Sequence, residues 1–507
     1  MPEYLSPGVY VEEVNSGPRP IEGVGTAMAA FVGFAPGGPV NEPTLVTNWS
    51  QYVEAFGSAE NGGRKNPHMK NAYLSHAVYG YFLNGGGRCY VTRVGAKAPS
   101  LQLPSRASKS VNALTLQAKP EASGNIDVEV APATGENPAE GTFTLKIGKG
   151  PSQETYDNVT LGKSKGAVKN VVEAVREKSQ LVMVMDSQAG AQPEAGKYVL
   201  SATEPASLPA VHPATLKGDS AARTGIEGLE IAEDATMVCC PDLMSALQAG
   251  MIDRDGVRAV QASMIAHCEK LGDRMAILDA PPNLTPQEVK AWREKETNYD
   301  SKYAVLYYPW IKVAGPDGKD MMVPPSGHMA GVYARSDNER GVHKAPANEV
   351  VRGAVQVVTP VTKGEQDLLN PIGVNCIRTF TGRGIRVWGA RTLSSDPAWR
   401  YINVRRLFNY VEKSIERGTQ WVVFEPNDPD LWARVRRDVG AFLTGVWRSG
   451  ALFGLTPEQA FFVKCDEELN PPDVRDRGQL IIEIGLAPVK PAEFVIFRLS
   501  QFAGGGA

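Results

Sequence analysis

The sequence predicts a multidomain protein that combines an α/β domain with an α+β domain, and three observations support this fold class. The chain has 507 residues. This is too long for a single hydrophobic core, so two to four domains are expected. Strand-like and helix-like segments alternate over residues 26–94 and again from residue 236, as in β-α-β units. Between these stretches the composition changes, and it changes again after residue 360.

The α/β domain is expected to span residues 21–98 and 225–359. Its first buried strand is "TAMAAFVGFAP" (Thr26–Pro36), followed by a helix, a Gly-rich stop and a strand at Cys89–Val94. The alternation resumes at "TMVCCPD" and continues through "VQASMIAHCEKLG", "RMAILDAPP", "TPQEVKAWREKE" and "KYAVLYYPWIKV". This order predicts a mostly parallel sheet.

A β-rich insertion is expected at residues 99–224. Ala, Ser, Gly, Pro and Lys dominate there and aromatic residues are scarce. "GTFTLKIGKG" and "QETYDNVTLG" are typical of hairpin strands, "AVKNVVEAVREKS" of a helix and "QLVMVMD" of a strand. We interpret the segment as a small peripheral module, since an insertion of this size is tolerated when its ends lie close together.

Residues 360–488 are expected to form a C-terminal domain. "NCIRTFTGRGIRVWGARTL" predicts strands around a Gly-Arg turn, and "WVVFEP" another strand. One amphipathic helix carries an apolar stripe of Leu407, Tyr410, Val411 and Ile415. A second long helix begins near "NDPD", where Asp428 or Asp430 is suited to cap it and Pro429 to an early helical position.

Each end of the chain carries one strand-like segment set apart by prolines and glycines. We assign residues 1–20 to an N-terminal arm, which contains "PGVYVEEV", and residues 489–507 to a C-terminal arm. A lone strand leaves its backbone N–H and C=O groups without partners. Two alternatives satisfy them: donation to a sheet of another molecule, or packing on the arm's own domain.

Composition narrows the functional classes. The net charge of −3 argues against wholesale nucleic-acid wrapping. No apolar run approaches the roughly 20 residues that span a bilayer, and no secretory signal pattern opens the chain. No histidine or cysteine spacing indicates a metal site, and the Gly-rich segments fit no phosphate-binding loop. We therefore expect no cofactor, and we expect buried, reduced thiols at Cys89, Cys239, Cys240, Cys268, Cys376 and Cys465.

Several long segments resemble contractile tail sheath proteins, which form the outer cylinder of contractile phage tails and of related bacterial injection systems. They are "SPGVYVEEVNSGPRPIEGVGTAMAAFVG", "PPSGHMAGVYARSDNERGVHKAPANE", "NPIGVNCIRTFTGRGIRVWGARTL", "WRYINVRRLFNYVEKSIERGTQWVVFEPND" and "LIIEIGLAPVKPAEFVIFRLSQ". They cover both ends and most of the chain outside the insertion. The residues leave open whether the particle is a phage tail or an injection system.

The resemblance implies a structural subunit, not an enzyme. It implies an α/β domain of subtilisin-like layout and stacked sixfold helical rings that surround an inner tube and contract. The partners would be other copies of the chain, the tube, a baseplate and a terminal cap, with no nucleic acid and no direct membrane insertion. The particle would assemble in the cytoplasm of the producing bacterium and act there or after release.

The resemblance also assigns the two arms. Segments Tyr4–Val14 and Glu493–Phe502 would pair with the C-terminal domain of a neighbouring subunit and share its sheets. The donor residues would be Val9, Tyr10, Val11, Glu12, Phe494, Val495, Ile496, Phe497 and Leu499.

One helix surface is a candidate for contact with the tube. In "DLWARVRRDVGAFLTGVWRSG", an apolar stripe of Leu431, Val435, Val439, Phe442 and Val446 is expected to be buried, with Arg434, Arg436 and Arg437 mostly off it. The alternative is a solvated helix face. The resemblance places such a helix against the tube, where exposed ion pairs of about 0–1 kcal/mol each would be weak enough to break on contraction.

A serine hydrolase is the alternative function. A catalytic triad needs a serine, a histidine base and an orienting aspartate, and Ser326, His328, Asp279 and His267 are the nominees. "SGHMAG" has His328 where a nucleophile loop would carry its serine, and no His-Gly-Thr or Asp-Thr-Gly segment accompanies it. Layout alone does not carry chemistry, so the structural reading is preferred.

Overall fold

The computed structural model describes residues 20–498, apart from the short segments 60–64, 96–99, 109–110, 120–123, 135–138, 151, 164–167, 188–191 and 203–207. The chain divides into two compact units. The sheet unit comprises residues 27–335 and 347–394, and the C-terminal unit comprises residues 1–26, 336–346 and 395–507. In the described part of the chain, no helix is both long and apolar enough to span a bilayer.

An eight-stranded sheet organises the sheet unit. Its strands are parallel except at both edges, where β2 and β21 run antiparallel to their neighbours. In spatial order they are β2 (Thr44–Val46), β5 (Cys89–Arg93), β1 (Ala29–Gly33), β14 (Met237–Cys239), β15 (Met275–Asp279), β16 (Ala304–Tyr308), β20 (Val374–Phe380) and β21 (Gly384–Val387). The mostly parallel sheet expected from the sequence is thus present.

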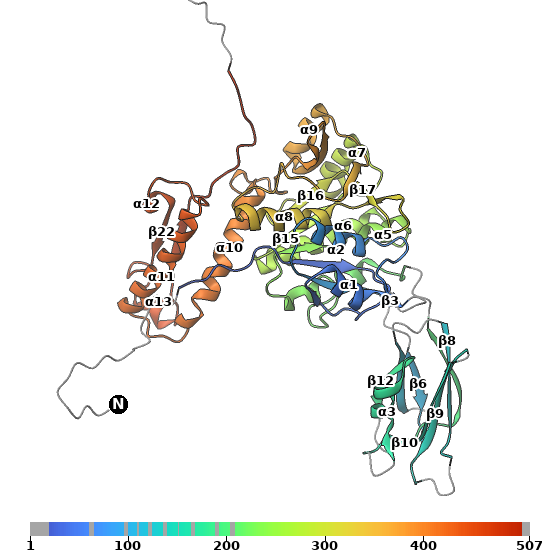
Figure 1. The fold of residues 1–507 in the computed structure, drawn as a ribbon. Coiled ribbons are helices and arrows are strands. Elements are labelled where there is room, and N and C mark those ends of the chain that lie inside the picture. The colour runs from blue at the N-terminus through green and yellow to red at the C-terminus, as the bar shows by residue number, and fades with distance from the viewer. Residues whose placement is uncertain are drawn as a thin grey trace, which may run out of the picture. The chain divides into compact units, whose positions relative to one another are not determined.

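Helices cover this sheet because its central strands are apolar on both faces. Every residue of β1, β15 and β16 is buried, as parallel strands between helical layers require. Helices α2 and α5 pack on β1 and α6 packs on β15 (Figure 1). Apart from one helix in the insertion, the described α-helices of the unit are α1 (Trp49–Phe56), α2 (Leu74–Leu83), α4 (Pro213–Lys217), α5 (Asp242–Gln248), α6 (Arg254–Leu271), α7 (Pro286–Ala291), α8 (Ser326–Arg340, whose last residues belong to the C-terminal unit) and α9 (Lys363–Leu369).

The segment "KYAVLYYPWIKV" forms two strands where one was expected. Pro309, which lacks a backbone N–H, separates β16 from β17 (Ile311–Ala314). Strand β17 leaves the large sheet and pairs antiparallel with β18 (Asp320–Val323) and β19 (Ala354–Val357). A further two-residue pair joins β3 (Ser58–Ala59) to β4 (Lys65–Asn66).

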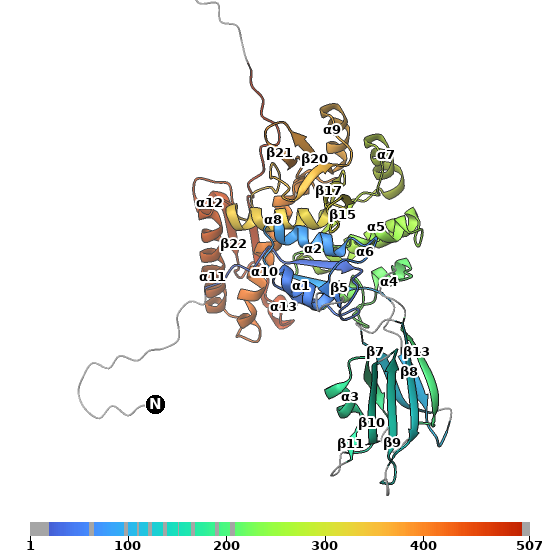
Figure 2. The ribbon, with the colours of Figure 1, turned by 45° about the vertical axis from the view of Figure 1, so that its right-hand side comes forward.

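The insertion has a hydrophobic core built only from its own residues, between Leu103 and Leu200. Helix α3 (Val171–Lys178) contacts β10 and β12 and lies beside the strands in Figure 2. One sheet has the order β11 (Lys169–Asn170), β10 (Ser152–Thr160), β9 (Phe143–Lys149), β8 (Gly124–Pro132) and β13 (Gly196–Ala202); the other has β12 (Val182–Ser187), β7 (Asn112–Ala118) and β6 (Ser100–Pro104).

The expected limit of the insertion at residue 224 needs correction. Helix α4 packs against α6, and Leu216 of α4 is fully buried. The sequence could not show this contact because α4 is only five residues long and its partner lies far along the chain. The segment from residue 208 onward therefore contributes to the packing around α6.

The C-terminal unit has a core of its own, centred on α10 (Ile402–Gly418) and α11 (Pro429–Arg448) (Figure 2). Strands β22 (Phe461–Lys464) and β23 (Glu483–Leu486) form an antiparallel pair, and β22 contacts α11. Two short helices, α12 (Pro457–Ala460) and α13 (Pro472–Asp476), complete the unit. Asp428 caps α11 through the amide of Leu431, with Pro429 in the first turn.

Two expectations for this region are wrong. The boundary at residue 360 is too early, because β20 continues the large sheet by pairing with β16, and the C-terminal unit resumes at Ser395. The strand expected at "WVVFEP" is absent: Gln420–Val422 is a 3-10 turn, and Phe424 has φ +70° and is fully exposed.

Candidate assembly surfaces

The C-terminal segment is held to its unit up to Glu493 and is exposed beyond it. The side-chain amide of Asn403 donates to the Val489 carbonyl at 3.1 Å, and the Tyr401 hydroxyl donates to the Glu493 carboxylate at 3.0 Å. After Glu493, residues 494–497 are 70–84% exposed and no strand forms up to residue 498. Four consecutive large apolar side chains are therefore presented to solvent: Phe494, Val495, Ile496 and Phe497.

The other predicted donor residues lie outside the described residues. These are Val9, Tyr10, Val11 and Glu12 at one end and Leu499 at the other. The described chain begins at Pro20, and Ile21 is already buried in the core of the C-terminal unit.

Strands β22 and β23 provide open sheet edges in the C-terminal unit. In the described part of the chain, these two strands pair only with each other. Directly after β23, residues 487–489 bond residues 451–453. Along β22 and β23 themselves no further strand pairs among the described residues, and open edges of this kind bind further strands. The large side chain of Phe462 in β22 is also exposed.

The three arginines nominated for tube contact lie on the exposed side of α11, and each has a partner in the chain. Arg434 lies 3.7 Å from the Glu425 carboxylate and over the ring of Trp421. Arg437 donates through Nε to the carboxylate of Asp438 at 3.0 Å, and Arg436 donates to the carbonyl of Cys465.

The apolar stripe of α11 is largely as expected. Leu431, Val435, Val439 and Val446 are buried. Phe442 is only partly buried, and Leu443 takes the fully buried position instead. The arginine face and the apolar face of the helix are thus distinct.

A buried ion pair fixes the C-terminal unit internally. The Arg406 guanidinium donates to both Asp337 carboxylate oxygens, at 2.8 and 2.6 Å, and to the carbonyl of Thr26 at 3.0 Å. The Thr26 hydroxyl donates to the same carboxylate at 2.6 Å. Both charged side chains are only 3% exposed, so the bidentate geometry and the additional hydrogen bond compensate for their desolvation. No sequence signal links residues so far apart in the chain.

The hydrolase nominees lie in the sheet unit, and two of them are joined through the backbone. Asp279 ends β15, and its carboxylate accepts the backbone N–H of Ser326 at 2.8 Å. This contact positions the first turn of α8. The ring of His328 lies against Gly80 of α2, where an added Cβ would meet it at 2.4 Å. Among the described residues, His328 has no hydrogen bond to Ser326 or Asp279.

His267 lies on α6 among different partners. Its Nε2 is 3.5 Å from the Arg274 guanidinium, and its Nδ1 is 3.8 Å from the Glu227 carboxylate. The four nominees therefore do not form the Ser–His–Asp hydrogen-bond chain that the chemistry requires, in the part of the chain described here.

Burial shifts the protonation of these groups. Desolvation raises the pKa of Asp279 to about 7, although the contact with Ser326 opposes the shift. Desolvation likewise lowers the pKa of His328 to about 4, and that of His267 to about 4 with a further contribution from the charge of Arg274. These histidines are neutral at pH 7, as in a packed interior.

All six cysteines are buried and form no disulfide. Burial raises the pKa of the Cys376 thiol to about 12, and desolvation raises the pKa of the Cys89 thiol well above its ordinary value. The expectation that these thiols are buried is confirmed. In the residues described, no group of three His, Cys, Asp or Glu side chains is arranged to hold a metal ion.

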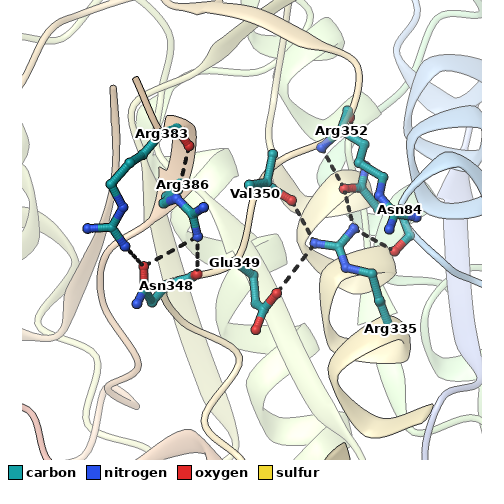
Figure 3. A network of polar contacts seen from close by, with 8 residues as sticks. All are labelled: Asn84, Arg335, Asn348, Glu349, Val350, Arg352, Arg383 and Arg386. Carbon is teal, nitrogen blue, oxygen red and sulfur yellow. Dashed lines mark hydrogen bonds and ion pairs between the residues drawn. The ribbon is translucent and has the colours of Figure 1, made fainter. Parts of the chain in front are cut away.

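A polar network in the sheet unit was not anticipated from the sequence (Figure 3). Asn84 accepts the backbone N–H of Arg352 at 2.8 Å and donates to the carbonyl of Arg352 at 3.0 Å. The Arg335 guanidinium donates to the carbonyls of Asn84 and Val350 and lies 3.9 Å from the Glu349 carboxylate.

At the other end of the network, Asn348 is held by two arginines. Arg386 donates to its carbonyl at 2.6 Å, and Arg383 donates to its side-chain oxygen at 3.1 Å (Figure 3). The segment 348–352 is thereby fixed along β21, where the carbonyl of Ile385 accepts the amide of Val351. The strands predicted around the Gly-Arg turn of "GRGIRVWG" are present as β20 and β21, but the sequence did not indicate these contacts.

The chain thus has a mixed α/β fold with an exposed apolar C-terminal segment, and comparison with known proteins identifies its class. A model described as the phage tail sheath protein central domain matches residues 232–393, and one described as the phage tail sheath C-terminal domain matches residues 394–502. Together they cover more than half of the chain. The chain belongs to the tail sheath protein family.

Curated relatives agree with this family. The tail sheath protein of Burkholderia phage BcepMu is 23% identical over 97% of this chain and 95% of its own length. Other relatives align over less: the tail sheath protein of Vibrio phage KVP40 is 29% identical over 39% of this chain and 29% of its own length. A putative prophage major tail sheath protein of Pseudomonas aeruginosa is 29% identical over 48% and 61%. The chain thus spans less than two thirds of these last two proteins.

Solved structures match over nearly the whole chain. The helical sheath of the anti-feeding prophage (AFP) in its contracted state is 26% identical, with a TM-score of 0.59, and the match covers 98% of this chain and 100% of that one. The AFP baseplate, sixfold symmetrised, gives 26% identity and a TM-score of 0.58 over 98% and 99%. The contracted sheath of the extracellular injection system PVC, at 24% identity and a TM-score of 0.59 over 99% of both chains, supports the fold alone.

Proposed function

We propose that this chain is a sheath subunit that polymerises as stacked sixfold helical rings around an inner tube and contracts to drive the tube through a target envelope. The observation that carries self-assembly is the exposed run Phe494–Phe497, in a unit whose described two-stranded sheet has open edges. The near-complete match to a contracted helical sheath supports the same proposal.

The exposed segment has the chemistry of a strand that is buried on both faces. In an extended strand, Phe494 and Ile496 point to one side and Val495 and Phe497 to the other. Both sides are apolar. The segment would therefore be stabilised if it paired with the edge of a sheet and other residues covered both of its faces. Each such side chain contributes at most about 1.5–3 kcal/mol on full burial. We propose that the segment pairs with the β22–β23 sheet of a neighbouring subunit.

The N-terminal arm is proposed to act in the same way. Val9 and Val11 alternate with Tyr10 and Glu12, a pattern that suits a strand donated to a neighbour. Leu499 would extend the C-terminal donor strand. The two arms would link each subunit to others while the compact units rotate and repack during contraction.

The remaining partners follow from the same assignment. Arg434, Arg436 and Arg437 are proposed to face carboxylates of the inner tube. A baseplate and a terminal cap would bound the cylinder, with no nucleic-acid partner and no direct membrane insertion. The particle would assemble in the cytoplasm of the producing bacterium. We further propose a subtilisin-like layout for the sheet unit and an outward position for the insertion.

The subunit is proposed to have no enzymatic activity and no cofactor. The placement of Ser326, His328, Asp279 and His267 supports this, because the aspartate contacts a backbone amide and the histidines face other partners. Incubation with an activated-serine probe tests the point. We expect no labelling, and stoichiometric labelling of Ser326 would revive the hydrolase alternative.

Removal of Met1–Ser16 tests the proposed function. The truncated chain is expected to fold, because the described core begins at Ile21, and to build no cylinders. Circular dichroism reports the fold and negative-stain electron microscopy reports the cylinders. Normal cylinders would show that the arm is not a donor, and loss of the fold would show that it packs on its own chain.

A further inference from the structure

Three guanidinium groups gather on one face of the β20–β21 hairpin. Arg378 and Arg386 are directly opposite each other across the antiparallel pair, so their side chains share a face. Phe380, two residues after Arg378, lies on the same face, and its ring is 5.4 Å from the Arg378 guanidinium and 5.9 Å from that of Arg383. Trp388 packs on Phe380, with ring centroids 4.4 Å apart. We name Arg378, Arg383 and Arg386 the arginine cluster.

The arginine cluster is held in place by neutral groups. Arg378 donates to the side-chain oxygen of Gln366 at 2.9 Å. Arg386 donates to the carbonyls of Arg383 and Asn348, and Arg383 donates to the Asn348 side chain (Figure 3). These contacts fix the positions of the guanidinium groups without neutralising their charge.

The arginine cluster therefore concentrates positive charge on one face of the hairpin, where the guanidinium groups repel one another. Like charges placed directly opposite each other across two strands are destabilising. Among the described residues, no carboxylate forms an ion pair with Arg378, Arg383 or Arg386, whereas Arg335 and Arg406 elsewhere in the chain have acidic partners. Planar guanidinium groups recognise carboxylates in bidentate geometry. A negatively charged partner would remove the repulsion.

The chain carries an acidic stretch whose charges are only partly used. Residues 466–476 include Asp466, Glu467, Glu468, Asp473 and Asp476. Two of these form exposed pairs, Glu468 with Lys464 and Asp473 with Arg477. Glu467 and Asp476 are exposed and, within the described residues, have no ion pair.

A second acidic run differs in this respect. Glu230 and Asp234 pair with Lys270 and Arg88, and the Glu227 carboxylate, only 19% exposed, lies 3.8 Å from the neutral ring of His267. Two of its charges are thus compensated within the chain, and a third is largely shielded from a partner. The stretch 466–476 is therefore the better electrostatic complement to the arginine cluster.

We propose that the arginine cluster binds the acidic stretch 466–476 of a second copy of this chain. This inference rests on the proposed self-assembly, because a homopolymer repeats both surfaces at every subunit. The contact is heterologous: one surface of each copy meets a different surface of the next, as helical assemblies require. It would add weak, salt-sensitive ion pairs to the lattice alongside the exchanged strands.

The test uses exposed positions in the full-length chain. Variant A is Arg383→Glu, variant B is Glu467→Lys with Asp476→Lys, and variant AB combines them. Lys319→Glu, at an exposed lysine in the β17–β18 turn, is the matched charge-reversal control. We expect A and B each to raise the critical concentration for polymerisation by about tenfold, as the loss of one or two exposed ion pairs implies. The control and AB should match the wild type.

Mixing A with B separates contacts between copies from contacts within one copy. In an equimolar mixture, the new carboxylate at position 383 of A can meet the new lysines of B. The intact arginine cluster of B can meet the intact acidic stretch of A, so polymerisation should return. If AB polymerises but the mixture does not, the contact lies within one chain and the proposal is wrong. It is equally wrong if A and B polymerise normally, or if AB is as impaired as A.

Two controls keep the outcomes distinct. Unchanged circular dichroism and thermal unfolding of A and B establish that each variant folds. A gel-shift assay measures binding to single-stranded RNA. If the wild type binds this RNA and variant A does not, while A polymerises normally, the arginine cluster binds nucleic acid and the proposal is overturned. Failure of the wild type to polymerise would instead overturn the proposed function.

Discussion

The insertion and the C-terminal unit each have their own hydrophobic core, but they treat their remaining apolar side chains differently. Among the described residues of the insertion, the exposed large apolar side chains are Val111 and Val199. The C-terminal unit exposes many more: Val423, Phe424, Phe453, Leu455, Phe462, Ile481, Phe494, Val495, Ile496 and Phe497.

The sheets of the insertion and of the C-terminal unit also differ, in the number of strands that each contains. The insertion places five strands in one sheet and three in another, around a single core. Among its described residues, the C-terminal unit has one two-stranded sheet, which is marginal without further strands or packing. The comparison teaches that the described part of the insertion buries most of its large apolar side chains in its own core, whereas the described part of the C-terminal unit leaves many exposed, as expected of a surface that binds partners.

The largest effect should follow from removing the exposed segment. Deleting residues 494–507 is expected to leave the fold intact, because the last described anchor to the unit is Glu493, and to abolish polymerisation. Loss of a donated strand removes several backbone hydrogen bonds, each worth about 0.5–1.5 kcal/mol net, together with its buried side chains.

Circular dichroism and negative-stain microscopy measure the two parts of this prediction. A milder variant, Val495→Ser with Phe497→Ser, should lengthen the lag before cylinders form. If the deletion variant forms cylinders of normal length, the exposed apolar residues have no role in assembly. The proposed difference between the insertion and the C-terminal unit would then be wrong.

Two deletions test whether the insertion is independent of the rest of the chain. Replacing residues 99–207 with a Gly/Ser linker should leave both stability and polymerisation unchanged, since the insertion packs on itself. Extending the replacement to residue 224 also removes Leu216 from its contact with α6. Loss of a buried leucine costs about 2–5 kcal/mol. Urea denaturation should separate the two variants, and equal midpoints would refute the revised limit.

A buried carboxyl group predicts a pH-dependent effect confined to the sheet unit. The pKa of Asp279 is raised by burial from 3.8 to about 7. Burying the charged carboxylate lowers the free energy of unfolding. This destabilisation is absent below about pH 4, where the carboxyl group is protonated in both the folded and the unfolded state. It grows as the pH rises from 4 to 7 and is fully present above pH 7.

Asp279→Asn removes this charge while keeping an oxygen that accepts the amide of Ser326. The variant should be more stable than the wild type at pH 8, by about 1–3 kcal/mol, and equally stable at pH 4. Chemical denaturation of a non-polymerising truncation at both pH values is the measurement. A stability difference that does not change with pH would show that the residue acts through packing rather than charge.

The smallest effect is expected on α11. Reversing Arg434, Arg436 and Arg437 to Glu should leave the fold intact, because these side chains lie off the buried stripe. It should weaken co-assembly with the tube protein at low ionic strength, where screening is least. Co-sedimentation with purified tube at two salt concentrations measures this, and unchanged binding at low salt would assign the arginines to a solvated surface.

Much of the sheet unit was predictable because buried parallel strands are short, continuous apolar runs. "AAFVG", "MAILD" and "AVLYY" show this property directly. The position of β20 was not predictable, since its partner β16 lies about 70 residues earlier, and pairing across such a distance leaves no local signal.

The assembly surfaces were predictable only in part. The run "FVIF" predicts a strand by its composition, but it forms no strand in the described chain, and its exposure became evident only from the structure. "WVVF" has the same β-branched and aromatic composition but forms a turn: Trp421 and Val422 pack against the core while Val423 and Phe424 are exposed, so local propensity was overridden by tertiary context. The arginine cluster depends on the register of β20 with β21, and the Asp337–Arg406 pair depends on packing between distant segments.

Electron microscopy of the purified full-length chain tests the central claim most directly. The account predicts hollow, striated cylinders that lengthen with protein concentration, because the exposed segment and the open edges of β22–β23 are present on every copy. A single monomeric species by light scattering, with no cylinders on the grid at high protein concentration, would contradict it.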